Sequence, residues 1–398
     1  MPTLIATNVP VTSAPARPNA CVSWVGRVVI FAATSIVVGI LWDISWHRTI
    51  GRDTFWTPAH IAIYLGGVLG GCTAGWLVLK TTFFGTSEDK AAAVRLWGFY
   101  GPIGAWVSIW GALAMLVSAP FDNWWHDAYG LDVKIISPPH SVLALGMWSV
   151  VGGALLLVLR EQNNARTGAA PPGRWLFIYA AGVLLAMASV FLTERSFPND
   201  QHSHLFYIWS ASTYPLYLLG VARAAKFHWA STMIALVYML IIALMVWLLP
   251  LFSGEPKLGP VNHRVDHFVP LPFPLLLIVP AIGIDLVRNW IGHGRSWWRD
   301  WLIVIACAAV FTALFATTQW NFSKFMLSSA ADNWFFAADR HWGYGETPGP
   351  WWKEFWANRR STSNPAATMM TFVGAFICAA ISSRLGLWLG NWMSKVRR

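Results

Sequence analysis

Apolar residues gather along the chain in runs of roughly 20, and short polar stretches separate the runs. A helix of that length crosses the hydrocarbon core of a bilayer and satisfies its own backbone hydrogen bonds there, whereas an open sheet cannot. The pattern therefore predicts an all-α fold, a polytopic transmembrane helical bundle with about ten transmembrane helices. The expected spans are residues 24–42, 58–79, 97–118, 139–159, 174–193, 205–222, 229–251, 269–288, 301–319 and 366–389.

Composition and charge agree with this class and orient the bundle. The chain is 56% hydrophobic and only 12% charged, and its formal net charge is +10. Seventeen of the 28 Lys and Arg residues, but only five of the 18 Asp and Glu residues, fall on the side that the N-terminus would share. Because basic residues concentrate on the cytoplasmic side of a membrane, we expect both termini to be cytoplasmic. The positive charge then reflects topology, and no nucleic-acid partner is expected.

The histidines are sorted along the same axis. Only His228 and His293 fall on the cytoplasmic side. The other nine lie in or beside predicted outer loops: His47, His60, His126, His140, His202, His204, His263, His267 and His341. Neutral imidazole is the commonest protein metal ligand, so this sorting favours a metal site that faces the outside, although any one of these residues can also be an ordinary interfacial polar residue.

A polar stretch follows the first apolar run, and a related stretch follows the third. Residues 42–60 read WDISWHRTIGRDTFWTPAH, and residues 122–140 read DNWWHDAYGLDVKIISPPH. Aligned from Asp43 and Asp122, both contain D-x-x-W-H-x-x-x-G-x-D and then Thr/Ser-Pro-x-His, with one extra residue in the second copy. We interpret the two stretches as an internal repeat of one helix hairpin.

The repeated spacing indicates metal chemistry. In each copy the aspartate precedes the first histidine by four residues, so a continuing helix projects both from one face. Thr57 and Ser137 are expected to N-cap the next helix, which puts the second histidine in its first turn. Two imidazoles and a carboxylate suit copper, zinc or iron(II); alternatively, these residues only pair with one another or cap helices. The predicted metal ligands are Asp43, His47, His60, Asp122, His126 and His140, with Arg52, Asp53 and Asp132 as supporting neighbours.

The segment HRTIGRDTFWTPAHIAIYLGG resembles the signature around one metal site in the C subunit of the copper-dependent membrane monooxygenases, the particulate methane and ammonia monooxygenases. Asp43, His47 and His60 match that family's ligand intervals, within its R-D-T-x-x-T-P-x-H context. The second stretch resembles the same subunit's neighbouring copper site, but Asp122 stands where the family has Asn. The resemblance covers about residues 40–155.

The resemblance implies a copper-binding integral membrane oxidoreductase that is monooxygenase-like and oxidises a small apolar substrate with dioxygen. It also implies a bacterial-type inner membrane, metal sites toward the periplasmic or outer side, and a homo- or hetero-oligomer with other membrane or periplasmic subunits. Zinc or iron stays open as the metal.

The chain divides into five predicted parts. A disordered cytoplasmic tail (1–23) precedes the metal-binding transmembrane half (24–160), which contains the repeat. Further transmembrane helices (161–320), an outer aromatic-rich loop (321–365), and a last helix with a basic tail (366–398) follow. Three other functions stay open: a membrane protein that acquires or transports metal, a non-catalytic subunit of a membrane complex that the metal stabilises, and haem ligation by paired histidines.

Overall fold

The computed structural model describes residues 23–130, 137–164, 173–225, 227–292, 296–356 and 364–398. Within these ranges the chain forms eleven α-helices and one short β-hairpin. Seven helices are long and apolar enough to cross a membrane, which confirms the prediction of an all-α polytopic membrane protein. They are α1 (Trp24–Thr49), α2 (Pro58–Phe84), α4 (Ile103–Tyr129), α5 (Pro138–Asn164), α8 (Ala230–Leu248), α10 (Trp297–Met326) and α11 (Pro365–Met393).

The remaining elements are shorter or less apolar. They are α3 (Ser87–Ala91), β1 (Val94–Leu96), β2 (Phe99–Gly101), α6 (Arg174–Val190), α7 (His204–Ala224) and α9 (Ile278–Ile291), with 3₁₀ turns that include η1 (Thr193–Arg195) and η2 (Pro198–Asp200). Helices α6, α7 and α9 correspond to three of the ten expected spans, but they are not among the seven candidate spans.

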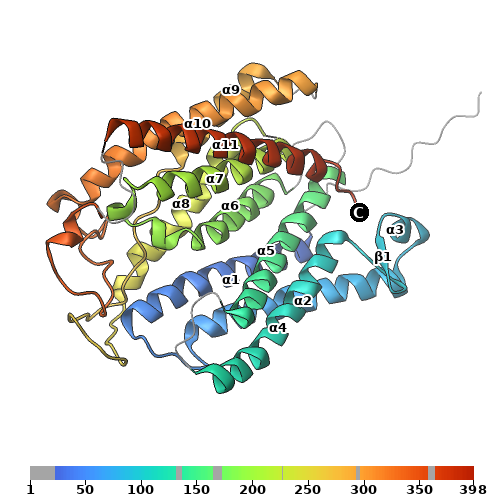
Figure 1. Ribbon diagram of the computed structural model, residues 1–398. Helices are drawn as coiled ribbons and strands as arrows, with labels where there is room; N and C mark the ends of the chain where they lie inside the picture. Colours follow the sequence, from blue (N-terminus) through green and yellow to red (C-terminus); the bar gives the residue numbers. More distant parts are fainter. Residues whose placement is uncertain (1–22, 131–136, 165–172, 226, 293–295, 357–363) are drawn as a thin grey trace, which may run out of the picture.

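The helices divide into two packed groups (Figure 1). Helices α1, α2, α4 and α5 contact one another in the N-terminal group, and α6 to α11 form the other. Within the first group, a Cβ added at Gly66 of α2 would lie 2.5 Å from the Ala32 carbonyl oxygen of α1, and one at Gly146 of α5 would lie 2.8 Å from the Gly111 carbonyl of α4. Glycine therefore lets both helix pairs approach closely, as in other membrane bundles.

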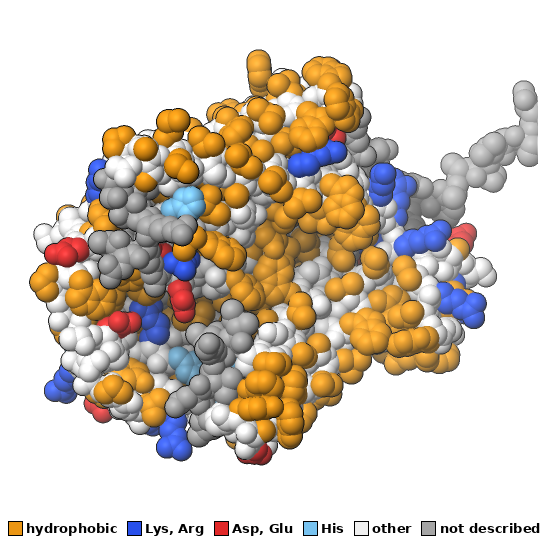
Figure 2. Space-filling model, viewed as in Figure 1, with side chains coloured by type: hydrophobic (Ala, Val, Ile, Leu, Met, Phe, Trp, Pro, Cys, Tyr) orange, Lys and Arg blue, Asp and Glu red, His pale blue; other side chains and the backbone are white. Residues whose placement is uncertain are grey.

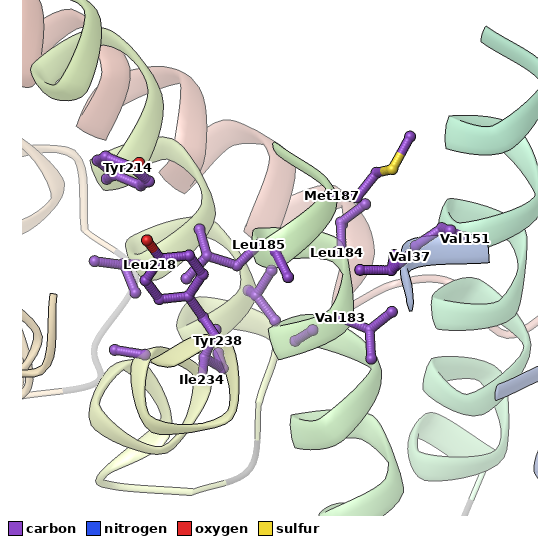
Figure 3. Close-up of a cluster of buried hydrophobic side chains, with 14 of the residues drawn as sticks. Val37, Val151, Val183, Leu184, Leu185, Met187, Tyr214, Leu218, Ile234 and Tyr238 are labelled. Carbon is purple, nitrogen blue, oxygen red and sulfur yellow. The ribbon is translucent and has the colours of Figure 1, made fainter. Parts of the chain in front are cut away.

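The two groups share a core of aliphatic and aromatic side chains (Figure 3). Val37 of α1 and Val151 of α5 meet Leu184 of α6 there, and Tyr214 of α7 and Tyr238 of α8 continue the core into the second group. The outer surface is also apolar along the flank of the bundle, whereas the charged side chains gather toward its two ends (Figure 2). Such a surface suits a bundle whose flank faces lipid.

Both described ends of the chain lie at one end of the bundle. Ser23, which precedes α1, donates a hydrogen bond to Glu161 near the end of α5. Asn163 of α5 donates to the carbonyl oxygens of Met393 and Val396, and the Ile103 backbone N–H donates to the Arg398 carbonyl. The α1–α2 and α4–α5 connections therefore lie at the opposite end. Residues 1–22 of the predicted tail (1–23) fall outside the described residues.

Two predicted span boundaries are wrong. Residues 97–101 belong to a hairpin rather than to the third span, because Trp97 (φ 50°) and Gly98 (φ 87°) form its turn, and α4 begins only at Ile103. Residues 269–277 of the eighth span are not helical, and α9 begins at Ile278. Proline at positions 270, 272 and 274 removes the backbone donors that a helix needs there.

Candidate metal centres

The first repeat brings its polar side chains together where α1 ends and α2 begins. Helix α1 continues past the apolar run to Thr49, so Asp43 and His47 project from one face as expected. The Asp43 Oδ1 atom lies 3.0 Å from His60 Nε2, and Asp43 Oδ2 lies 3.8 Å from His47 Nε2. The carboxylate of Asp43 thus lies between the two imidazoles. We call these three residues and Asp53 cluster A.

The second repeat forms the same arrangement where α4 ends and α5 begins. The Asp122 Oδ2 atom lies 3.4 Å from His126 Nε2, and Asp122 Oδ1 lies 3.5 Å from His140 Nε2. The two ring centroids are 6.5 Å apart. We call these three residues cluster B. In both clusters one carboxylate oxygen faces the helical histidine at i+4 and the other faces the histidine of the following helix, so the sequence repeat is also a repeat in space.

Backbone carbonyls fix the tautomer of one histidine in each cluster. His60 Nδ1 lies 2.9 Å from the Thr54 carbonyl oxygen, and His126 Nδ1 lies 3.2 Å from the Gly130 carbonyl oxygen. A carbonyl can only accept a hydrogen bond, so the proton is on Nδ1 and the lone pair of a neutral ring is on Nε2. In both clusters that lone pair is directed toward the shared carboxylate. Two such acceptors in contact repel each other unless a proton or a metal ion lies between them.

The carboxylate oxygens that face the second histidine of each repeat are buried and unsatisfied. Among the described residues, Asp43 Oδ1 and Asp122 Oδ1 accept no hydrogen bond, and His140 Nδ1 also has no partner. Buried polar atoms normally have a partner, because leaving one unpaired costs roughly 1–3 kcal/mol. These orphaned atoms are what we expect of a site that a cation completes.

The distances test whether a metal would fit. A copper or zinc ion lies about 2.0–2.2 Å from nitrogen and oxygen donors, which places two donors of one ion about 3.0–3.4 Å apart. The Asp–His separations are 3.0 and 3.8 Å in cluster A and 3.4 and 3.5 Å in cluster B. However, no group of three or more His, Cys, Asp or Glu within the described ranges is already arranged to hold an ion. The donor types are those of a metal site, but the separations of 3.8 and 3.5 Å exceed this range, so binding would require the imidazoles to move closer to the carboxylates.

The supporting residues differ in their placement. The Asp53 Oδ2 atom lies 3.6 Å from His47 Nε2 and 3.4 Å from His60 Nε2, so Asp53 contacts both imidazoles and is a fourth potential ligand. The exposed Arg52 forms no ion pair within the described part of the chain, but its carbonyl oxygen accepts a hydrogen bond from Trp46 Nε1 at 3.0 Å. The third predicted supporting residue, Asp132, lies outside the described residues.

The predicted helix caps are formed in only one repeat. The Ser137 Oγ atom accepts a hydrogen bond from the His140 backbone N–H at 3.3 Å, as expected of an N-cap. Thr57 occupies the equivalent position but does not cap α2, because its hydroxyl instead accepts from the Thr54 N–H at 2.8 Å. This turn places the Thr54 carbonyl beside His60.

Two outer loops cover the α1–α2 connection next to cluster A. We call residues 253–270 and 337–346 the outer cap. Lys257 N–H donates to the Ile50 carbonyl at 2.9 Å, and Tyr344 N–H donates to the Arg48 carbonyl at 3.2 Å. The Arg48 guanidinium in turn donates to the His341 carbonyl. His341, one of the nine histidines that the sequence places in or beside predicted outer loops, therefore anchors the outer cap and does not join a cluster.

Tyr64 was not singled out from the sequence. It lies one turn after His60 on α2, 6.1 Å from it between ring centroids, and its side chain interacts electrostatically with Asp43, Asp53 and Asp122. Tyr64 thus lies near the carboxylates of both clusters. The i, i+4 spacing from His60 was the available signal, but only the packing of α2 against α4 brings Asp122 near.

Comparisons of the chain with models of protein families, with curated protein sequences and with solved structures find no match.

Proposed function

We propose that this membrane protein binds copper at the two clusters and acts as a monooxygenase-like oxidoreductase on a small apolar substrate. The metal assignment rests on one observation. In both repeats the Nε2 atoms of two imidazoles are directed toward one aspartate carboxylate, whose Oδ2 atom faces the first histidine and whose Oδ1 atom faces the second. Simple helix capping or an isolated ion pair would not require the same three donors twice.

The choice of copper rests on donor chemistry and on the family resemblance. Imidazole-rich sites bind copper more strongly than the other common divalent metals, and two imidazoles with a carboxylate leave positions open for further ligands. Bound copper would supply one-electron redox chemistry toward dioxygen, with one oxygen atom entering a substrate C–H bond and the other leaving as water on reduction by an external two-electron donor. Zinc or iron(II) is the alternative that metal analysis distinguishes.

The chain's own residues would fix the geometry. Thr54 and Gly130 orient His60 and His126 through their carbonyl oxygens, which keeps Nε2 available as a ligand. Asp43 contributes a carboxylate whose side chain is only 15% exposed, whereas that of Asp122 is 32% exposed. Because Asp122 stands where the family has Asn, cluster B carries an extra negative charge, and we expect it to hold a divalent cation more tightly than an amide would.

The proposed function implies an orientation of the helices in the membrane. We infer that α6, α7 and α9 cross the membrane together with the seven candidate spans, and that both termini are cytoplasmic. The clusters then face the periplasmic or outer side of a bacterial-type inner membrane. The sorting of basic residues supports this orientation. Besides the bilayer, we expect further copies of the chain or other membrane and periplasmic subunits as partners, including the source of electrons.

Electron paramagnetic resonance of copper(II)-loaded protein in nanodiscs tests the assignment. We expect hyperfine splitting from imidazole nitrogens, and we expect the signal of cluster A to be lost in a His47→Ala/His60→Ala variant. The control is His228→Ala, because His228 lies at the cytoplasmic end beside Asn289. A wild-type spectrum without nitrogen coupling would refute the metal assignment.

A second measurement tests the reaction separately. Copper-loaded protein is given a chemical reductant, dioxygen and a short-chain alkane, and hydroxylated product is quantified. We expect product from wild type and at least a tenfold loss in the double variant. Copper binding with no product from any small apolar substrate would leave the metal sites standing and contradict the oxygenase function.

A further inference from the structure

A single charged residue lies within the apolar length of α11. Arg384 is the only Lys, Arg, Asp or Glu of this helix. It stands nine residues before Met393, the last residue of α11, which is about 14 Å along the helix axis. Charged side chains are rare in membrane spans and are normally paired there. The position of Arg384 therefore raises the question of which group compensates its charge.

The described part of the chain supplies no anion to Arg384. Its side chain forms no ion pair and no hydrogen bond with the described residues, and its guanidinium instead lies 5.1 Å from the centroid of the Trp301 ring. The acidic residue of α10, Asp300, is already engaged, because its Oδ1 atom accepts a hydrogen bond from Arg223 at 3.0 Å. An aromatic face attracts a cation but does not neutralise it. Arg384 is thus left with a charge that a counter-ion can compensate.

The contact with Trp301 places the guanidinium near the membrane surface. Trp301 lies four residues after Trp297, the first residue of α10, and side chains of a helix lean toward its N-terminus. The indoles of Trp297 and of Trp388, one turn after Arg384 on α11, are 75% and 68% exposed at the same end of the bundle. Exposed tryptophans of a membrane protein gather at the interface between headgroups and hydrocarbon. The Arg384 guanidinium therefore lies at the level of the lipid headgroups.

A groove opens farther along the same pair of helices. Helices α10 and α11 lie side by side (Figure 1), and the groove between them has a volume of about 360 Å³. Small side chains of α10, including the exposed Ala309 and Ala313 and the half-buried Ala316, form one wall, and Phe372 and Phe376 of α11 form the other. Because alanine fills little space beside the two rings, the groove is open to the flank of the bundle and suits a hydrocarbon chain.

The arginine and the groove lie in line along the two helices. Ala309 follows Trp301 by eight residues on α10, and Phe376 precedes Arg384 by eight residues on α11. Eight residues of an α-helix span about 12 Å, so on both helices the groove begins about 12 Å from the cation, toward the middle of the bilayer. A cation at headgroup level with an apolar groove below it matches the two parts of a phospholipid.

We propose that α10 and α11 bind one anionic phospholipid, with its phosphate on Arg384 and an acyl chain in the groove. A guanidinium donates two parallel hydrogen bonds to a phosphate, which makes arginine well suited to this contact. A headgroup whose only charge is the phosphodiester compensates Arg384, whereas a choline headgroup would bring a second cation. Basic sites between membrane helices on the cytoplasmic side bind anionic headgroups in this way. Clusters A and B lie on other helices, so lipid binding does not depend on copper.

Native mass spectrometry of the delipidated full-length protein tests the proposal. The protein is titrated in detergent with phosphatidylglycerol, or with phosphatidylcholine that has the same acyl chains, and the Kd of the first bound lipid is measured. We expect phosphatidylglycerol to bind more tightly, and Arg384→Gln to weaken it about tenfold, because a charge-assisted hydrogen bond is lost. Arg384→Lys should retain part of the affinity. The matched control is Arg299→Gln, because Arg299 also lies 5.1 Å from a tryptophan ring, that of Trp298, but lines no part of the groove.

A second variant tests the groove separately. Ala313→Phe fills it from the exposed side of α10 and should weaken phosphatidylglycerol binding roughly tenfold, because the acyl chain loses its apolar contacts. The control is Val373→Phe, since Val373 of α11 is also exposed but does not line the groove. Equal affinity for the two lipids, or an unchanged affinity for phosphatidylglycerol in Arg384→Gln or in Ala313→Phe, would overturn the site. A dimer that dissociates in Ala313→Phe would assign the groove to a second copy of the chain and would also overturn it.

Discussion

Each repeat ends its first helix with a glycine in the left-handed region. Gly51 has φ 82° and Gly130 has φ 93°, a conformation that costs side-chain-bearing residues about 1–2 kcal/mol. Both glycines stand at the same position of the repeated pattern, so the turn geometry was duplicated together with the ligands. Their surroundings differ, since a Cβ at Gly51 would lie 2.0 Å from the Tyr344 hydroxyl, whereas a Cβ at Gly130 would have no atom of the described residues within 4 Å. Only cluster A is covered by the outer cap.

At the residue scale, sequence spacing was sufficient to find the six proposed ligands, because i, i+4 pairs on a helix and a histidine in the next first turn follow from local geometry. It did not reveal the carbonyls of Thr54 and Gly130 that orient the imidazoles, since every residue has a carbonyl and no sequence pattern marks these two. The direct contact of Asp53 with both imidazoles was also missed, because it depends on the path of the α1–α2 turn.

The buried His341 side chain is expected to make the stability of the fold depend on pH. Burial, together with the positive charges of Arg48 and Lys353, lowers the pKa of His341 to about 3, against a backbone hydrogen bond at Ala337 that raises it. The unfolded chain takes up a proton below about pH 6.5 while the folded chain does not, so stability is lost as the pH falls from 6.5 toward 3. In a His341→Phe variant we expect Tm to fall less over this pH range than it does in the wild type.

The measurement is Tm between pH 7.5 and 4.5 for wild type and His341→Phe. The control is His267→Phe, because His267 lies on the outer cap but contacts the exposed Asp266. Parallel Tm curves for wild type and His341→Phe would contradict the account of this residue.

At the element scale, hydropathy located the helices but not the breaks within them. The hairpin at 94–101 and the segment at 269–277 have the composition of spans, yet Gly98 and the prolines at 270, 272 and 274 control the backbone there. Helix α9 is consequently short, and the sequence could not show how it is held. The structure shows that Asp285 of α9 accepts hydrogen bonds from the Ser231 and Thr232 N–H groups at 3.2 and 2.8 Å, and so caps α8.

The capping of α8 by Asp285 predicts how substitution of this residue changes the stability of the protein. Asp285 and Arg288 form a buried ion pair at 3.0 Å, and removal of one partner of such a pair typically costs about 3–5 kcal/mol. Asp285→Ala should therefore lower Tm strongly while leaving the metal content of the folded fraction unchanged. In the double variant Asp285→Ala/Arg288→Met, part of the lost stability should return, because no charge is left unpaired.

The same measurement addresses metal transport. An ion path through the membrane usually needs ionisable residues within the spans, and Asp285 lies in the expected span 269–288, but its hydrogen bonds to α8 give it a structural role. Thermal unfolding and elemental analysis on the folded fraction check this role. A stable Asp285→Ala variant with altered metal content would contradict it and revive the transport hypothesis.

At the scale of the whole molecule, the order of helices and the placement of both clusters at one end followed from the alternation of apolar and polar segments. The contacts between distant parts did not. The packing of α7 against α11 and the docking of the outer cap on the α1–α2 connection join residues more than 150 positions apart. No local pattern records such contacts, which is why residues 337–346 of the outer cap were expected only as part of an aromatic-rich loop, and residues 253–270 were not expected to cover the α1–α2 connection.

The most direct test of the central claim is the metal content of purified full-length protein, measured by elemental mass spectrometry. Wild type is compared with a cluster A variant (Asp43→Ala/His47→Ala/His60→Ala), a cluster B variant (Asp122→Ala/His126→Ala/His140→Ala) and their combination. Asp127→Asn is the control, because the Asp127 side chain is exposed and, among the described residues, accepts a hydrogen bond from Asn123 alone. We predict copper that falls by one equivalent in each variant and disappears in the combination. A copper content that is unchanged in the cluster A variant, the cluster B variant and their combination, or the absence of bound metal in the wild type, would contradict the account.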